Sequence, residues 1–184
     1  MLYIPYSAML FTISILWVLN RFYFYKKTRS FSWKRELQLS LVYICIVVVV
    51  RFTFCPFSKV NGKIQPLEID LGRIYPFRIN LEPFVHLFDY TIYREAILNL
   101  VGNITMFIPL GIVWPCVYKE LNTPAKAITA GIGASLCIEI LQLPIYSRLS
   151  DIDDLILNST GYLIGYVIYL FVRTLKQLIA NRHC

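Results

Sequence analysis

Residues 95–111 read EAILNLVGNITMFIPLG, and residues 139–161 read EILQLPIYSRLSDIDDLILNSTG. Both stretches place carboxylates, amides or an arginine within or beside sequence that is otherwise apolar enough for a membrane interior. Polar side chains at membrane depth are costly, so they usually face one another and serve a function. These stretches therefore predict a helical membrane fold that holds a cluster of polar side chains.

The composition of the 184-residue chain is that of a polytopic membrane protein. Apolar residues make up 57% of the sequence, aromatic residues 15%, and the mean hydropathy is +0.58. A helix needs about 20 apolar residues to cross the hydrocarbon core of a bilayer. Five stretches meet this requirement: 5–24, 37–57, 96–118, 124–146 and 155–172. We expect an all-α transmembrane bundle of about five spans, without a separate soluble domain.

The distribution of basic residues predicts the orientation of the chain. They fill the connection between the first two spans, namely Arg21, Lys26, Lys27, Arg29, Lys34 and Arg35. Cytoplasmic loops are enriched in lysine and arginine, so we expect the N-terminus outside the cell and the C-terminus in the cytoplasm. Orientation and attraction to anionic lipids then explain the net charge of +7, and we expect no nucleic-acid partner.

The long connection at 58–95 is expected to be external. Within it, Asn80 and Pro83 suit the start of a helix, and the sequence FVHLF at 84–88 predicts a short helix lying in the outer membrane interface. We expect His86 to pack there rather than to catalyse a reaction. The five cysteines are odd in number and four lie in apolar spans, so we expect neither disulfides nor a cysteine metal site.

Helix geometry predicts that polar residues of the third and fourth spans lie at a common depth. Asn99 and Asn103 are four residues apart and share a helical face. Glu139 lies about 22 Å along the fourth span, from a rise of about 1.5 Å per residue. Gln142 is three residues further on the same face. Both pairs are expected in the outer half of the membrane.

The start of the fifth span adds acidic residues at the same level. Asp151, Asp154 and Asn158 have the spacing i, i+3 and i+7, which predicts that they share one helical face. Arg148 in the preceding turn and Arg51 near the end of the second span complete the group. The predicted site therefore consists of Arg51, Asn99, Asn103, Glu139, Gln142, Arg148, Asp151, Asp154 and Asn158.

These residue types permit catalytic, binding and structural roles. An ionised Glu139 in hydrocarbon is costly, so either Arg51 or Arg148 neutralises it, or it is protonated and able to transfer a proton. Asp151 and Asp154 would orient Glu139 or hold a cation. Acidic oxygens suit Mg²⁺ or Ca²⁺, but the sequence identifies no metal and no cofactor. Alternatively, the amides simply join helices, each contributing about 0.6 kcal/mol.

A small-residue motif predicts close helix packing. Gly161 and Gly165 form a small-xxx-small face in the fifth span. Such faces let a neighbouring backbone approach closely. The neighbour is either another helix of the same chain or a second copy, so a homo-oligomer remains an alternative.

Four segments resemble the VanZ-like family of bacterial membrane proteins. They are NLEPF at 80–84, NLVGNITMFIPLG at 99–111, EILQ at 139–142 and RLSDIDDLILNSTGYLIG at 148–165. The resemblance covers about the last 105 residues and implies residence in a bacterial membrane. We expect an N-terminal anchor helix and basic cytoplasmic loop at 1–36 and a VanZ-like transmembrane domain at 37–184, in the bacterial cytoplasmic membrane. Carried over to this sequence, the motif nominates Asn103, Glu139, Gln142, Arg148, Asp151, Asp154 and Asn158.

The resemblance implies a link to glycopeptide resistance, since the namesake raises resistance to teicoplanin, but no settled biochemical activity. Two classes of function follow. The first is an enzyme or binder acting at the outer face on a lipid-linked cell-wall precursor or an anionic lipid, with Glu139 as the proton-transfer group, Asp151 and Asp154 beside it, and Arg148 clamping the head group. The second is a non-catalytic scaffold or partner-binding protein in which the polar cluster fixes helix register.

Overall fold

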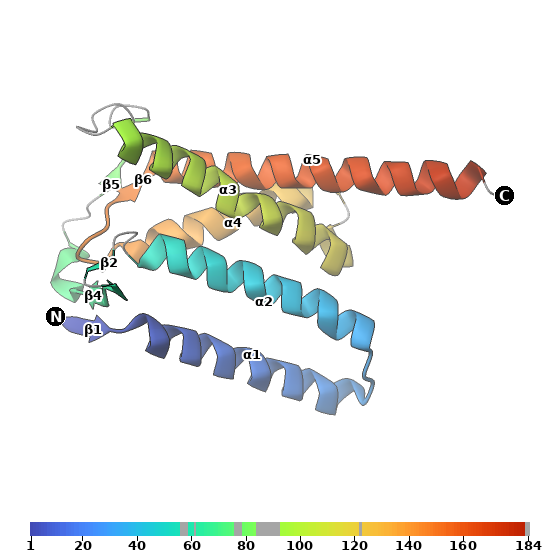
Figure 1. The fold of residues 1–184 in the computed structure, drawn as a ribbon, viewed down its shortest axis with the longest axis horizontal. Helices are drawn as coiled ribbons and strands as arrows, with labels where there is room; N and C mark the ends of the chain where they lie inside the picture. The colour runs from blue at the N-terminus through green and yellow to red at the C-terminus, as the bar shows by residue number, and fades with distance from the viewer. Residues whose placement is uncertain (56–58, 61, 76–78, 84–92, 122, 183–184) are drawn as a thin grey trace. The chain divides into compact units, whose positions relative to one another are not determined.

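A computed structural model describes residues 1–55, 59–60, 62–75, 79–83, 93–121 and 123–182. It has five long helices: α1 (Tyr6–Thr28), α2 (Trp33–Phe54), α3 (Tyr93–Val117), α4 (Pro124–Gln142) and α5 (Ile152–Arg182) (Figure 1). All five are long and apolar enough to cross a membrane. The predicted all-α, five-span fold class is therefore confirmed.

Short strands and turns of 3₁₀ helix connect the helices. The strands are β1 (Leu2–Ile4), β2 (Lys59–Val60), β3 (Lys63–Ile64), β4 (Leu67–Ile69), β5 (Ile79–Asn80) and β6 (Ser150–Asp151), and the 3₁₀ turns are η1 (Leu71–Arg73) and η2 (Lys119–Leu121). Strand β1 pairs with β4 and β2 with β3, both antiparallel, whereas β5 and β6 are parallel. The last pair joins segments far apart in sequence.

The chain forms two compact units. The first unit comprises Met1–Asn80 and Ile138–Asp151, and the second comprises Leu81–Cys137 and Ile152–Cys184. Helices α1 and α2 with all six strands belong to the first unit, and helices α3 and α5 belong to the second.

In the first unit, α1 and α2 form an antiparallel hairpin (Figure 1). The rings of Trp17 and Tyr43 lie 5.6 Å apart, and the Tyr43 hydroxyl is 2.7 Å from the Ser14 hydroxyl. Arg29 ends α1 with a φ of 49°, and its N–H bonds the carbonyl of Tyr25. This left-handed residue lets the chain leave the helix and satisfies one of its last carbonyls.

In the second unit, α3 and α5 approach closely because glycines line their contact. A Cβ atom at Gly161 would overlap the carbonyl oxygen of Ile104, and one at Gly165 would overlap that of Ile108. Helix α3 also continues through Pro109 and Pro115. The small-residue motif therefore packs against another helix of the same chain, which is the first of the two predicted alternatives.

Two helices are longer than the apolar runs that predicted them. Helix α5 continues past residue 172 to Arg182, and α1 continues past residue 24 to Thr28. Hydropathy marks where a helix meets water, whereas lysine, arginine, glutamine and leucine continue the helix itself. The predicted interfacial helix at 84–88, with His86, lies outside the described residues.

We predict that Gly161→Ala destabilises the protein by about 1–3 kcal/mol, because the added methyl group forces α3 and α5 apart. The matched control is Gly133→Ala in α4, since a Cβ there meets no atom within 4 Å. Thermal unfolding in detergent, followed by size-exclusion chromatography with fluorescence detection, measures both. Equal midpoints for the two variants would contradict close packing at Gly161.

Candidate functional site

Each of the two units holds a hydrogen-bonded group of polar residues that includes predicted site residues. We call the residues Asn80, Glu139, Ser150 and Asp151 of the first unit the Glu139 cluster. The residues Asn99, Asn103 and Asp154 of the second unit form the Asn103 cluster. A single pocket lined by all nine predicted site residues stays a prediction.

Glu139 lies in the last turn of α4 and is 5% exposed. Its Oε2 accepts hydrogen bonds from the Ser150 hydroxyl at 3.2 Å and from the backbone N–H of Asp151 at 3.0 Å. The single Ser150 hydroxyl proton is shared with the Glu139 carbonyl oxygen, which lies 2.9 Å from the hydroxyl oxygen. These bonds hold the segment after α4 against the end of that helix and fix the position of the Glu139 carboxylate.

Asp151 is positioned by strand pairing. Ser150 and Asp151 form β6, which lies parallel to Ile79 and Asn80 of β5. The Asn80 side-chain amide donates to Asp151 Oδ1 at 3.1 Å. The half-buried Asp151 carboxylate is thereby held by the Asn80 amide, while the Asp151 backbone binds Glu139.

This arrangement corrects the prediction that Asp151, Asp154 and Asn158 share one helical face. Helix α5 begins at Ile152, so Asp151 precedes it in extended conformation. The pairing with β5 accounts for the difference, because strand pairing requires an extended backbone at Asp151. Asp154 and Asn158 do lie within α5, four residues apart.

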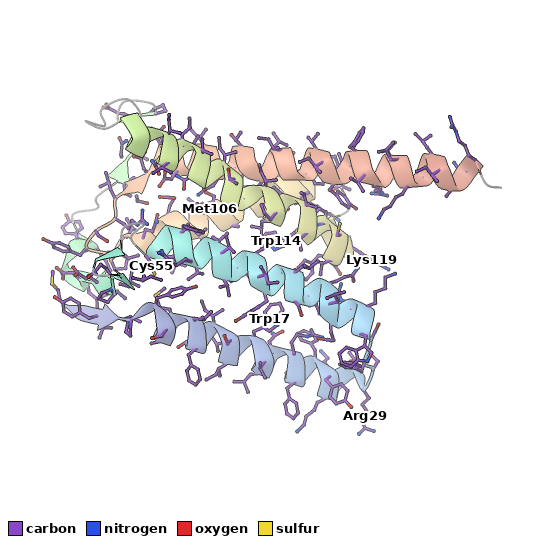
Figure 2. All side chains as sticks on the ribbon, viewed as in Figure 1. Trp17, Arg29, Cys55, Met106, Trp114 and Lys119 are labelled. Carbon is purple, nitrogen blue, oxygen red and sulfur yellow. The ribbon has the colours of Figure 1, made fainter. Side chains whose placement is uncertain are left out.

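Gln142 and Arg148 bind main-chain carbonyls at the C-terminal end of α2. The Gln142 amide donates to the carbonyl of Thr53 at 2.8 Å. Arg148 Nη2 lies 3.1 Å from the carbonyl oxygens of both Phe52 and Cys55. Figure 2 shows Cys55 at this end of the helix. The last carbonyls of a helix have no intrahelical partner, so these two side chains supply one.

Arg51 lies at the same helix end. Its Nη1 is 3.5 Å from the Cys55 carbonyl oxygen, and its guanidinium carbon lies 5.7 Å from the ring centroid of Tyr6 and 5.6 Å from that of Phe52. Cation–π contacts of this length are favourable. The counter-ion role toward Glu139 stays a prediction, while the observed contacts connect α2 to the start of α1.

In the second unit, the Asn103 cluster connects α3 and α5. The Asn103 amide donates to Asn99 Oδ1 at 3.1 Å and to Asp154 Oδ1 at 2.5 Å. The first bond confirms that Asn99 and Asn103 share a face of α3. The second bond connects α3 to α5.

Asn158 makes a different connection. It is 1% exposed, and its amide donates to the Ser135 hydroxyl of α4 at 3.1 Å. Its Oδ1 has no hydrogen-bond partner among the residues that the structure describes. Asn158 therefore joins α5 to α4 within the core of the second unit.

Four contributors were absent from the predicted site: Thr53, Asn80, Ser135 and Ser150. Three carry small hydroxyl groups, which apolar helices tolerate and hydropathy does not mark. Asn80 does appear in the NLEPF segment of the family resemblance, which was the available signal. Within the described ranges, no group of three histidine, cysteine or acidic side chains is arranged to hold a metal ion.

A family model for VanZ/LLP1 matches residues 40–173, a range that includes every predicted site residue. The chain belongs to the VanZ/LLP1 family. This confirms the resemblance and, with the five apolar helices, supports a multi-pass membrane protein. Neither the curated proteins nor the solved structures compared with the chain gave a match.

We predict that Arg148→Met lowers the free energy of unfolding by about 1–3 kcal/mol, because two helix-end carbonyls lose a charged donor. The control is Arg182→Met, the same change at an exposed position near the end of α5. Thermal midpoints in one detergent compare the variants. If Arg148→Met unfolds at the temperature of the control, the proposed cap of α2 is wrong.

Proposed function

We propose that this VanZ/LLP1 family member binds a lipid-linked cell-envelope molecule at the Glu139 cluster and thereby contributes to glycopeptide resistance, including resistance to teicoplanin. The observation that carries the proposal is the fixed pair of carboxylates at the end of an apolar helix. Glu139 is buried and held by two donors, and the neighbouring Asp151 is half-buried and held by Asn80.

The surroundings of the cluster suit an amphiphile. Ile140 and Leu141, in the same turn of α4 as Glu139, are 56% and 60% exposed. Large apolar side chains exposed on a membrane helix contact lipid chains. A ligand whose acyl or prenyl chain lies along α4 would bring its head group to Asp151 and Asn80. Amide, hydroxyl or ammonium donors of that head group would bind the carboxylate oxygens.

An outer position of this site is part of the proposal. It is supported by the basic residues between the first two spans, which favour the cytoplasm for the opposite ends of α1 and α2. Lipid-linked precursors of the cell wall and glycopeptides meet on the outer face of the membrane. The site would then meet its ligand where glycopeptides act.

Proton transfer by Glu139 would be an additional step. Its Oε2 lies at hydrogen-bond distance from Ser150 and from the Asp151 backbone, so its position is fixed as a general acid or base requires. Asp151 would orient the bound head group. Glu139→Gln keeps the shape of the side chain and an oxygen acceptor, but the amide cannot act as a general acid or base. This variant therefore separates ligand binding from catalysis.

A non-catalytic scaffold is the second candidate function. It is favoured by the observation that Glu139, Gln142 and Arg148 all bond main-chain groups of the first unit. Side chains used in this way fix the ends of α2 and α4. In this case the surface around β5 and β6 would serve as a contact for a partner rather than as a reactive site.

We predict that Asp151→Asn lowers the amount of co-purified envelope lipid about tenfold, because a charge-assisted bond to the head group is lost. Teicoplanin resistance of the producing cells should fall in parallel. The measurements are mass spectrometry of extracted lipids and the inhibitory teicoplanin concentration at matched expression. Glu120→Gln, which neutralises an exposed carboxylate in η2, serves as the control.

The same assays applied to Glu139→Gln distinguish the candidate functions. Retained lipid with loss of resistance supports proton transfer. If Asp151→Asn and Glu139→Gln both fold and leave lipid binding and resistance at wild-type levels, the Glu139 cluster is structural and the scaffold function stands.

A further inference from the structure

A groove lies at the far end of the second unit, away from the acidic start of α5. Its volume is about 350 Å³. It is lined by Cys116 of α3 and by Tyr169, Val172, Arg173, Lys176, Gln177 and Ala180 of α5. The residues from α5 recur at intervals of three or four, so they form one continuous stripe along the helix.

The groove spans the boundary between the apolar and the polar part of α5. Helix α5 has 31 residues, a length of about 46 Å, whereas the hydrocarbon core of a bilayer is about 30 Å thick. Helix α3 ends at Val117, and α5 continues beyond that end (Figure 1). Tyr169 and Val172 belong to the last turn of the apolar run, and Arg173 begins the polar extension.

The lining combines two cations with an apolar wall. Arg173 and Lys176 are one turn apart on the same face, and the described lining contains no carboxylate. Neither side chain makes a hydrogen bond or an ion pair with another residue of the described chain. One arginine can donate to two phosphate oxygens at once, and lysine binds phosphate as a point charge. This charge is complementary to a single anionic group seated at the membrane surface.

We infer that this groove binds an anionic glycerophospholipid. The phosphate lies between Arg173 and Lys176, and one acyl chain follows Val172, Tyr169 and Cys116 into the bilayer. The apolar wall favours a lipid over free phosphate, because a lipid has an acyl chain to contact it and free phosphate does not. The site is separate from the one proposed for the envelope molecule, because the two sites share no residue.

Native mass spectrometry of the detergent-purified full chain tests this inference. Phosphatidylglycerol and phosphatidylcholine with identical acyl chains are added in separate titrations, and inorganic phosphate in a third. We expect one phosphatidylglycerol per chain, retained with about tenfold preference over phosphatidylcholine. The double variant Arg173→Gln, Lys176→Gln should abolish the preference.

The charge-matched control is Lys126→Gln, Arg182→Gln, which removes two exposed cations of the second unit from outside the groove. It should keep the preference. Three results overturn the inference: an equal loss in both double variants, equal retention of the two lipids, or displacement of the lipid by millimolar phosphate. Because all four positions are exposed, the variants should unfold at the wild-type midpoint, and this is checked first.

Thiol labelling locates the bound lipid. Cys116 and Cys137 are both free and exposed in the second unit, but only Cys116 lines the groove. In a Cys184→Ser background, phosphatidylglycerol should slow maleimide labelling of Cys116 and leave Cys137 unchanged. The groove variant should lose this protection. Equal slowing at both cysteines would place the lipid elsewhere.

Discussion

The structure depends on one constraint: a polar group enclosed by apolar helices needs a partner. At the end of α4, this constraint is met by the Glu139 carboxylate, which binds the Ser150 hydroxyl and the Asp151 backbone. The turn after α4 is thereby held in place, and Arg148 and Gln142 reach the carbonyls that end α2. The same bonds that stabilise the first unit position the carboxylates to which we assign ligand binding.

The second unit meets the constraint in part, with fewer polar groups and closer packing, and Asn158 Oδ1 has no partner among the described residues. Glycines at 161 and 165 bring the backbones of α3 and α5 together, which leaves little space between these helices. Asn103 and Asp154 then bond directly at 2.5 Å, and Asn158 reaches Ser135. These amides connect helices within the second unit, and their role in ligand binding stays a prediction. Toward the other end, α5 continues past the end of α3 and carries Arg173 and Lys176, the cations assigned to the lipid phosphate.

Features that depend on neighbouring residues were predicted correctly, whereas features that depend on contacts between remote segments were not. Apolar runs predicted five helices because a span must be apolar along its whole length. The i, i+4 spacing of Asn99 and Asn103 correctly predicted that they share a helical face. The helical face assigned to Asp151 was wrong, because a local spacing rule cannot detect that β5, about seventy residues earlier, pairs with this segment. A ligand-binding role of Arg148 and Gln142 stays a prediction. Both side chains donate to backbone carbonyls, which a sequence does not distinguish from a ligand.

The sequence by itself determined the membrane class, the number of spans, the family and the set of polar residues that deserve partners, since each of these follows from composition or local order. Only the tertiary structure decided the partners. It paired Asp151 with Asn80, attached Arg148 to the end of α2, and used the glycine face of α5 for contact within the chain. The physical reason is that hydrogen bonds and close contacts depend on distances between segments remote in sequence, whereas hydropathy and helix period depend only on neighbours along the chain.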